Sequence, residues 1–227
     1  MISICIPTYE MKGKGLEYLE YSFQMLYKQT FKDFEVIISD HSITDSIENL
    51  CKKWQEFLNI VYVRNKNNRG SSSSNINNAI KNATGEIIKI LFQDDFLYDE
   101  ESLYKQIKNF NGGWLVTSCC HYKNNQFYKN FYPTYNNNIH YGDNTISSPS
   151  VLMFENKEVL EFDENLIWFM DVDYYKRLYN KFGLPYICND ITVVNREHEY
   201  QVTKIIITNE IINKELNYIK QKYENIH

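Results

Sequence analysis

The feature that most constrains the fold is the alternation of short apolar strands with amphipathic helical segments in the first hundred residues. Apolar runs suited to strands occupy residues 2–6, 35–39, 60–63 and 86–92, and helical spacing marks 16–29, 45–59 and 75–82. Strands that alternate with helices at this spacing predict a parallel sheet with right-handed crossovers. Because these strands are apolar on both faces, we expect helices to cover both sides of the sheet.

The second half of the chain is less regular. Helices are expected at residues 101–110, 171–182 and 205–224, and strands at 114–122, 151–154 and 186–194. Residues 124–150 have mostly the composition of a loop, rich in Asn. The sequence has no internal repeat and no linker long enough to separate two domains. We therefore expect a single domain over residues 1–227.

Composition excludes several classes of protein. The net charge of −5 argues against general binding of nucleic acid, which needs a basic face. The five cysteines form no CxxC pair, which predicts buried free thiols in a reducing compartment rather than a zinc site. No signal peptide and no apolar run of about 18 residues is present. The sequence thus predicts a cytoplasmic protein without a transmembrane segment, and it leaves peripheral membrane association open.

Polar groups follow three of the four early strands. Pro7, Thr8 and Tyr9 end the first strand, Asp40 ends the second, and the adjacent Asp94 and Asp95 end the fourth. Ligands of open parallel sheets bind beyond the carboxyl ends of the strands, so these groups should meet at one edge. Two adjacent carboxylates repel unless a positive charge lies on them. Mg²⁺ or Mn²⁺ would supply it, whereas the alternative is a solvated turn.

Three further segments carry candidate groups. Residues 69–75, "RGSSSSN", precede a helix and could offer an anion site, or could be a flexible loop with a helix cap. Asp171 and Asp173 begin a helix and point to different faces, so one could act as a base while the other caps; alternatively both cap. Arg196 and His198 follow the last strand and could stabilise a diphosphate or bind metal, or could lie in a surface turn.

The order of these motifs resembles glycosyltransferase family 2. The resemblance covers roughly residues 1–200 and rests on "ISICIPTYE", "YKQTFKDFEVIISDHSITD", "GSSSSNINNAIKNATGEIIKILFQDD" and "WFMDVDYYKRL". It implies the GT-A fold, a mostly parallel central sheet flanked by helices, and an inverting enzyme that uses a nucleotide-sugar donor. It further implies a nucleotide-sugar-binding half at residues 1–95, an acceptor-side half at 96–202 and a C-terminal helix at 203–227.

The resemblance also implies roles for individual residues. Thr8 and Tyr9 would flank the nucleotide base, and Asp40 would receive the imide N–H of that base. Asp94 would meet ribose or metal, and Asp171 would be the general base. The implied nucleotide-sugar-binding residues are Pro7, Thr8, Tyr9, Asp40, Arg69, Asn75, Asp94 and Arg196, and the implied ligands of Mn²⁺ or Mg²⁺ are Asp95, Asp94 and His198.

The sequence departs from the family pattern at several positions. His41 replaces the second acidic residue of the "DDGSTD" loop, and Phe92 replaces the first Asp of the "DxDD" motif. Met170 stands in place of the Glu that usually precedes the base. Asn75 or Ser74 stands where an Arg is often found, and Arg69 is the candidate to compensate. These departures put the choice of nucleotide in doubt and leave fewer carboxylates for a metal.

The function implied is transfer of a sugar, with a UDP-sugar as the first expectation, to a hydroxyl of a glycan or glycoconjugate. Residues 144–150 are the candidate acceptor-side loop. One alternative is a catalytically degenerate GT-A protein that binds a nucleotide or glycan without turnover. The departures at His41 and Phe92 support this alternative. Another is a sugar nucleotidyltransferase, faintly suggested by residues 12–15, "KGKG". The sequence specifies neither the sugar, the acceptor nor the oligomeric state.

Overall fold

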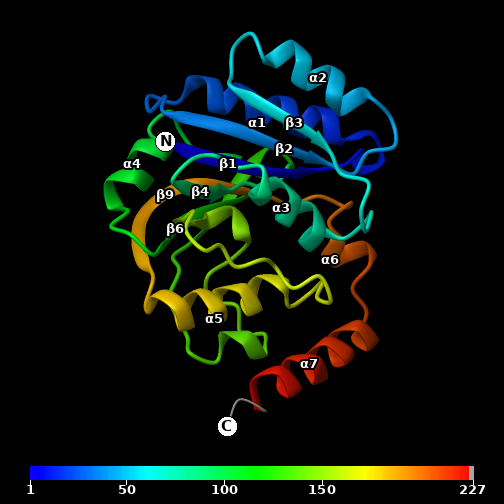
Figure 1. Cartoon of the computed structure of the whole chain (residues 1–227), viewed down its shortest axis with the longest axis vertical. Helices are drawn as coiled ribbons and strands as arrows, with labels where there is room; N and C mark the ends of the chain where they lie inside the picture. The colour runs from blue at the N-terminus through cyan, green and yellow to red at the C-terminus, as the bar shows by residue number, and fades with distance from the viewer. Residues whose placement is uncertain (225–227) are drawn as a thin grey trace.

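The computed structural model describes residues 1–224 and contains one large sheet with helices packed against it (Figure 1). The order of the nine strands is β3-β2-β1-β4-β8-β6-β9-β5, and β7 pairs with β6. Parallel and antiparallel neighbours both occur, so the sheet is mixed.

The first half forms the predicted parallel unit. Its strands are β1 (Ile2–Thr8), β2 (Phe34–Asp40), β3 (Ile60–Arg64) and β4 (Ile87–Ile90), and its helices are α1 (Gly15–Lys28), α2 (Ser46–Trp54) and α3 (Ser72–Lys81). All residues of β1 and β2 are buried, as expected for strands that helices cover on both faces. Thr8 pairs with Asp40 in the parallel register, so these two strands end side by side.

The second half adds strands of both directions. Its strands are β5 (Phe96–Leu97), β6 (Trp114–Lys123), β7 (Gln126–Phe131), β8 (Leu152–Glu155) and β9 (Tyr186–Arg196), and its helices are α4 (Ser102–Asn109), α5 (Met170–Phe182), α6 (Val202–Ile205) and α7 (Asn209–Glu224). Strand β8 lies antiparallel between β4 and β6, whereas β9 is parallel to β6. Short 3-10 turns η1 (Met11–Gly13), η2 (Ile139–Tyr141) and η3 (Pro149–Val151) complete the fold.

Two sequence expectations were wrong. Residues 126–131, expected as loop, form β7 in a hairpin with β6. Five of the six β7 residues are exposed, so the strand has no buried face to produce a periodic signal. The single helix expected over 205–224 is divided into α6 and α7, and Thr208 Oγ1 accepts a hydrogen bond from the Ile211 amide at the start of α7. Residues 225–227 of the expected C-terminal helix lie outside the described residues.

The core runs through both halves of the sheet. It includes the fully buried Trp114, which stacks against Tyr175, and the stacked pair Phe162 and Tyr174, whose ring centroids lie 3.8 Å apart. All five cysteines are buried free thiols, as predicted. Within residues 1–224, none of the helices combines the length and apolar character needed to cross a membrane. The cytoplasmic location and the peripheral membrane contact stay predictions of the sequence.

Candidate active site

A cavity of about 880 Å³ lies at the carboxyl ends of β1 and β4 and extends to the beginning of α5. Its lining includes seven of the predicted site residues, namely Pro7, Tyr9, Arg69, Asn75, Asp94, Asp95 and Asp171. The parallel register brings the first and fourth strands to this edge, and α5 contributes the candidate base to the same cavity. The structure thus brings most of the predicted groups together around one space.

Tyr9 presents a partly exposed ring to the cavity, with 38% of its surface accessible. Its backbone N–H donates to Oε1 of the buried Gln93 over 2.9 Å. The side-chain amide of Gln93 in turn donates to the carbonyl of Gly15 at the start of α1. Gln93 therefore fixes the chain on either side of η1, and the ring of Tyr9 is available for stacking on a flat ligand.

Asp40 lies behind the cavity wall rather than on it. The side chain is fully buried, and its Oδ1 accepts hydrogen bonds from Thr8 Oγ1 at 3.2 Å and the Ser42 amide at 2.9 Å. Its Oδ2 accepts from the hydroxyl of Tyr62 at 2.7 Å, and Arg64 Nε lies 3.6 Å away. Oδ1 thus has two protein donors and Oδ2 has one, and the side chain has no exposed surface, so direct binding of a base N–H would require the groups around Asp40 to move. In this arrangement Asp40 and Thr8 hold the loop that follows β2.

His41, which replaces a family carboxylate, joins two loops at the cavity. Its Nδ1 accepts a hydrogen bond from the Gly70 amide at 3.3 Å, and its Nε2 lies 3.1 Å from the carbonyl oxygen of Asn67. The acceptor role of Nδ1 places the proton of the neutral ring on Nε2, which then donates to that carbonyl. Burial lowers the pKa of His41, in agreement with a neutral imidazole.

Hydrogen bonds at the start of α3 fix the loop that precedes this helix. Ser71 accepts from the Ser74 amide at 3.1 Å as the N-cap of α3. Asn75 accepts from the Ser39 hydroxyl at 2.7 Å and donates to the Thr8 carbonyl at 3.0 Å. Asn75 therefore ties α3 to the ends of β1 and β2, and Arg69 extends from this loop into the cavity lining.

The carboxylates of Asp94 and Asp95 have different surroundings. Asp95 is buried, and its Oδ1 accepts from the Arg196 amide at 3.0 Å while its Oδ2 accepts from Ser148 at 3.3 Å. Burial, followed by the adjacent charge of Asp94, raises the pKa of Asp95 to about 8. The Oδ2 of Asp94 lies 2.8 Å from Nε2 of His198. A cation at this pair would relieve the repulsion that raises the pKa.

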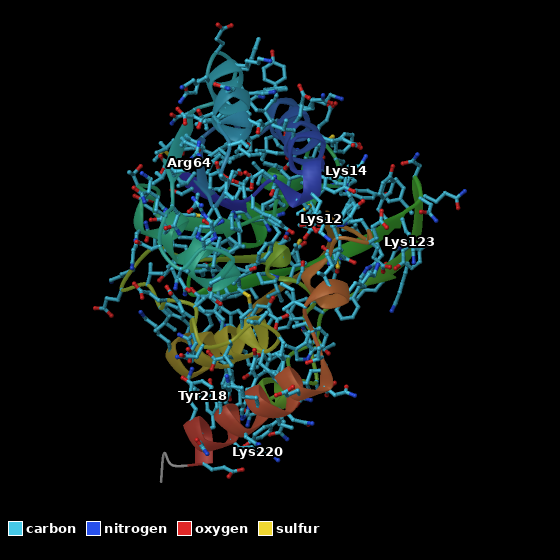
Figure 2. The ribbon with its side chains drawn as sticks, turned by 90° about the vertical axis from the view of Figure 1, so that its right-hand side faces the viewer. Lys12, Lys14, Arg64, Lys123, Tyr218 and Lys220 are labelled. Atoms are coloured by element: carbon cyan, nitrogen blue, oxygen red, sulfur yellow. The ribbon has the colours of Figure 1, made fainter. Side chains whose placement is uncertain are left out.

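The structure places the side chains of Arg196 and His198 away from the main cavity. They line a second cavity of about 450 Å³, which Lys14 and Lys123 also border (Figure 2). Successive side chains alternate along an extended chain, so Asn195 and Glu197 line the main cavity and their neighbours do not.

Arg196 contacts the backbone of Asp94 from the side of the second cavity. Its Nε donates to the backbone carbonyl of Asp94 at 3.0 Å, and its guanidinium lies 4.6 Å from the ring centre of Tyr18 and 5.0 Å from that of Phe96. Arg196 and His198 thus contact Asp94 from the second cavity, and neither lines the space in which a diphosphate beside Asp94 and Asp95 would lie.

The donor set is suited to a metal that a ligand helps to bind. Among residues 1–224, no cluster of three or more His, Cys, Asp or Glu side chains is arranged to hold a metal by itself. Mg²⁺ and Mn²⁺, however, commonly use one or two carboxylates together with phosphate oxygens. Asp94 and Asp95 fit that pattern, with His198 as a further candidate ligand or as the residue that orients Asp94.

Asp171 occupies the first turn of α5 and faces the main cavity. Its Oδ1 accepts from the Val172 amide at 2.7 Å and its Oδ2 accepts from the side-chain amide of Asn144 at 2.7 Å. Loss of hydration in this position raises the pKa of Asp171 to about 7, against the effect of both hydrogen bonds. A carboxylate with this pKa is suited to accept a proton near neutral pH.

Asp173 points to the other side of α5, as the helical spacing predicts. It is fully buried and forms ion pairs of 2.8 Å with Arg177 and with Lys222. Residues that the sequence did not single out contribute to the site as well. Gln93 and Ser148 act through long-range hydrogen bonds, for which a single sequence contains no local signal.

Comparison with known proteins identifies the class. The fold matches Staphylococcus aureus TarS 1-349 in complex with UDP, with a TM-score of 0.70 at 16% identity over 99% of this chain and 72% of that one. It also matches mannosyltransferase PcManGT from Pyrobaculum calidifontis in complex with GDP-Man and Mn²⁺, with a TM-score of 0.62 at 18% identity over 86% and 56% of the two chains. These neighbours confirm the predicted GT-A fold.

The family model described as Glycosyl transferase family 2 matches residues 3–203, and the chain belongs to this family. Glycosyltransferase GlyG of Streptococcus pneumoniae serotype 4 is 29% identical over 59% of this chain and 44% of its own length. A GalNAc(5)-diNAcBac-PP-undecaprenol beta-1,3-glucosyltransferase of Campylobacter jejuni is 30% identical over 42% of this chain and 30% of its own. The chain thus spans less than half of these two relatives. The predicted family and the glycosyltransferase class are confirmed.

Proposed function

We propose that this chain transfers a sugar, with inversion, from a nucleoside diphosphate donor to a hydroxyl of a glycan or glycoconjugate. One observation carries the proposal: Asp171, whose pKa is raised to about 7, faces the same cavity as Asp94, Asp95 and the ring of Tyr9. In-line displacement at an anomeric carbon requires a base and a diphosphate site around one reacting centre, and both sets of residues line this cavity.

The donor half is proposed to bind the nucleotide between Tyr9 and two loops, the one after β2 that carries His41 and the one before α3 that carries Arg69. Asp40 and Thr8 would fix the first loop, and Asn75 would hold α3 at the end of the second. TarS has been crystallised with UDP and with UDP-GlcNAc, which supports a UDP-sugar as the donor. PcManGT was crystallised with GDP-Man, so GDP is the second nucleotide to test.

The acceptor is proposed to enter beside α5. Trp168 and Ile167 are each partly exposed at the cavity, and an aromatic ring next to a base offers a face on which a sugar can pack. Residues 144–150 would cover this side and limit the access of water. Asn144 and Ser147, both in this loop, line the same cavity.

The chemistry follows from these positions. Asp171 accepts the proton of the acceptor hydroxyl while the hydroxyl oxygen forms a bond to the anomeric carbon. The bond from that carbon to the diphosphate breaks, and its electron pair leaves with the nucleoside diphosphate. A divalent cation, Mn²⁺ or Mg²⁺, held by Asp94 and Asp95 would offset the negative charge of the leaving group. His198 would orient Asp94 or become a further ligand.

The test combines binding with turnover. Melting is measured with UDP, GDP and dTDP, each with MnCl₂, MgCl₂ or EDTA, because a ligand that binds only the native state raises the melting temperature. The best nucleotide then selects UDP-sugars or GDP-sugars for a transfer assay with wild type and Asp171→Asn. We expect a metal-dependent rise for one nucleotide in both proteins, and transfer by the wild type alone.

Each other result has a defined meaning. Transfer by Asp171→Asn at the wild-type rate would contradict the assignment of the base. A nucleotide-dependent rise without turnover of any donor would favour the catalytically degenerate binding protein instead. The absence of any rise with the three nucleotides would contradict the nucleotide site itself.

A further inference from the structure

The last helix contributes one buried carboxylate that binds the chain segment before α5, and that segment lines the main cavity. Glu215 on α7 retains 4% of its surface, although it lies in a helix with several exposed residues. Its Oε1 accepts from the Ile167 amide at 2.8 Å, and its Oε2 accepts from the amides of Trp168 at 2.9 Å and Phe169 at 3.0 Å. Three consecutive backbone N–H groups therefore converge on a single side chain.

These N–H groups belong to Phe169, the N-cap of α5, and to the two residues before it. Phe169 is the N-cap of α5, and its side chain makes no capping hydrogen bond. Glu215, remote in sequence, supplies an acceptor for the Phe169 amide and for the two amides before it. The turn that it holds continues into Met170 and Asp171, and residues 167–171 all line the main cavity. The position of Asp171 thus depends on a carboxylate from α7.

Other contacts attach α7, which lies below α5 in the view of Figure 1, to the same part of the molecule. The hydroxyl of Tyr218, labelled in Figure 2, donates to Asp163 at 2.9 Å, and Lys222 bridges Asp163 at 2.7 Å and Asp173 at 2.8 Å. The hydroxyl of Tyr223 donates to Asp173 at 2.9 Å. These contacts hold both ends of the segment from Asp163 to Asp173, and Glu215 fixes its middle.

We propose that Glu215 is a positioning residue, which places Asp171 and the adjacent acceptor wall by binding the three amides before α5. The proposal rests on the proposed function in one respect, the role of Asp171 as base. It assigns to α7 a part in catalysis rather than core packing alone. Glu215 itself does not line the cavity and touches no reacting atom.

The charge of Glu215 gives a second way to observe the link. Burial is the main cause of the raised pKa of Asp171, and the negative charge of Glu215 raises it further. Two other side chains interact with Asp171. The pKa of Tyr175 on α5 is raised by burial first and by the charge of Asp171 second, and Asn144 is a neutral donor to the Asp171 carboxylate. Removal of the Glu215 charge should lower the pKa of Asp171, so the acid limb of the kcat profile should move to lower pH.

The test compares Glu215→Gln with Glu215→Asp and with the exposed control Glu210→Gln on the same helix. In Glu215→Gln one of the two acceptors becomes a donor that faces an N–H, so at least one amide loses its partner. Because a misplacement of about 1 Å can cost ~10²-fold in rate, we expect kcat to fall at least about tenfold. The KM for the donor should stay within about twofold, since the donor half of the site is untouched.

Hydrogen exchange of the amides of residues 167–169 separates positioning from turnover. We expect the exchange of these amides to be faster in Glu215→Gln than in the wild type. In Glu215→Asp the rate should lie between those of the wild type and Glu215→Gln, and in Glu210→Gln it should match the wild type. Unchanged exchange in both Glu215 variants would overturn the proposal, even for a protein in which no transfer is detected. Wild-type kcat and an unmoved acid limb in Glu215→Gln would overturn it as well.

A different experiment, the transfer assay with Asp171→Asn, tests the proposed function itself. If Asp171→Asn transfers sugar normally, Asp171 is not the base, whatever the Glu215 variants show. If Glu215→Gln does not fold, Glu215→Asp retains the charge on a shorter side chain and carries the same exchange measurement. Fast exchange together with slow transfer in Glu215→Asp would support the positioning role, and wild-type exchange with wild-type transfer would overturn it.

Discussion

The side-chain amide of Asn144 donates a hydrogen bond of 2.7 Å to the carboxylate of Asp171, which joins the 144–150 loop to the candidate base. Asn144 is itself oriented, because its carbonyl oxygen accepts from the amides of Ile146 and Ser147, each at 3.0 Å. The side-chain NH2 group is thereby directed to Asp171, and it also donates to the carbonyl of Ser147 at 3.1 Å. A donor in this position favours the ionised form of the carboxyl.

Replacement of Asn144 by Ala should raise the pKa of Asp171 above about 7, because the ionised form loses a donor. We expect the acid limb of the kcat profile to move to higher pH, opposite to the shift expected for Glu215→Gln. Transfer near pH 7 should fall several-fold, and much of the loss should be recovered near pH 9. An acid limb at the wild-type position would contradict the role given to this hydrogen bond.

Asp171→Asn should change stability as well as activity. Asp171 titrates near about 4 in the unfolded chain and at about 7 in the folded protein. Between these values the folded protein holds a proton that the unfolded chain has lost, so the free energy of unfolding falls as pH rises from about 4 to about 7. The Asn side chain cannot ionise and avoids this loss. At pH 8 the variant should melt a few degrees higher, since ~1 kcal/mol corresponds to about 2–4 °C here.

Asp173→Asn is the matched control, two residues along the same helix. Asp173 is buried and paired with Arg177 and Lys222, so its neutralisation leaves two cations without their partner. This variant should melt below the wild type at pH 8. At pH 4 the advantage of Asp171→Asn should disappear, because Asp171 is then protonated in the folded protein. An equal advantage at both pH values would rule out the titration of Asp171 as its cause.

The network around Asp40 gives a prediction about the donor half. Tyr62→Phe removes the hydroxyl that donates to Asp40 at 2.7 Å and accepts from Arg64 at 2.6 Å. A buried charge that loses a donor should cost about 1–3 kcal/mol of unfolding free energy, measurable by urea denaturation. Tyr27→Phe, at an exposed position, should change the midpoint little. Equal midpoints for the two variants would show that Asp40 does not need this donor.

The parallel half of the fold could be predicted because each of its elements carries its own periodicity. Strand β1 is buried throughout and apolar except at Ser3 and Thr8, and Leu19, Phe23 and Leu26 lie on the buried face of α1. Once these elements are placed in a parallel sheet, the ends of β1 and β4 must meet, so Tyr9, Asp94 and Asp95 reach one cavity. Strand β7 escaped detection because its stability derives from pairing with β6 and not from a buried face of its own.

The rest of the site depends on contacts that local patterns do not encode. Glu215 in the sequence is one more acidic residue of an amphipathic helix, and its three acceptor bonds arise only when α7 docks on the turn before α5. The resemblance implied that Arg196 lies at the diphosphate and His198 on the metal, and in the structure both contact Asp94. The side on which these side chains emerge depends on the register of β9 and of the chain that follows it. That register directs them into the second cavity.

The carboxylate pair gives the last prediction, which concerns the metal. Asp95→Asn keeps the size of the side chain and an oxygen for the Arg196 amide, but it removes one negative charge from the candidate metal site. The variant should fold and melt near or above the wild type without ligands, because a neutral amide avoids the cost of burying a charge beside Asp94. With the preferred nucleoside diphosphate, MnCl₂ should raise the melting temperature of the wild type well above the value in EDTA, and this difference should shrink or vanish in Asp95→Asn.

Asp99→Asn, which alters a carboxylate that pairs with Lys105 on α4, is the control and should keep the full metal-dependent rise. If Asp95→Asn also keeps it, Asp95 is no metal ligand, and its burial beside Asp94 has a purely structural cause.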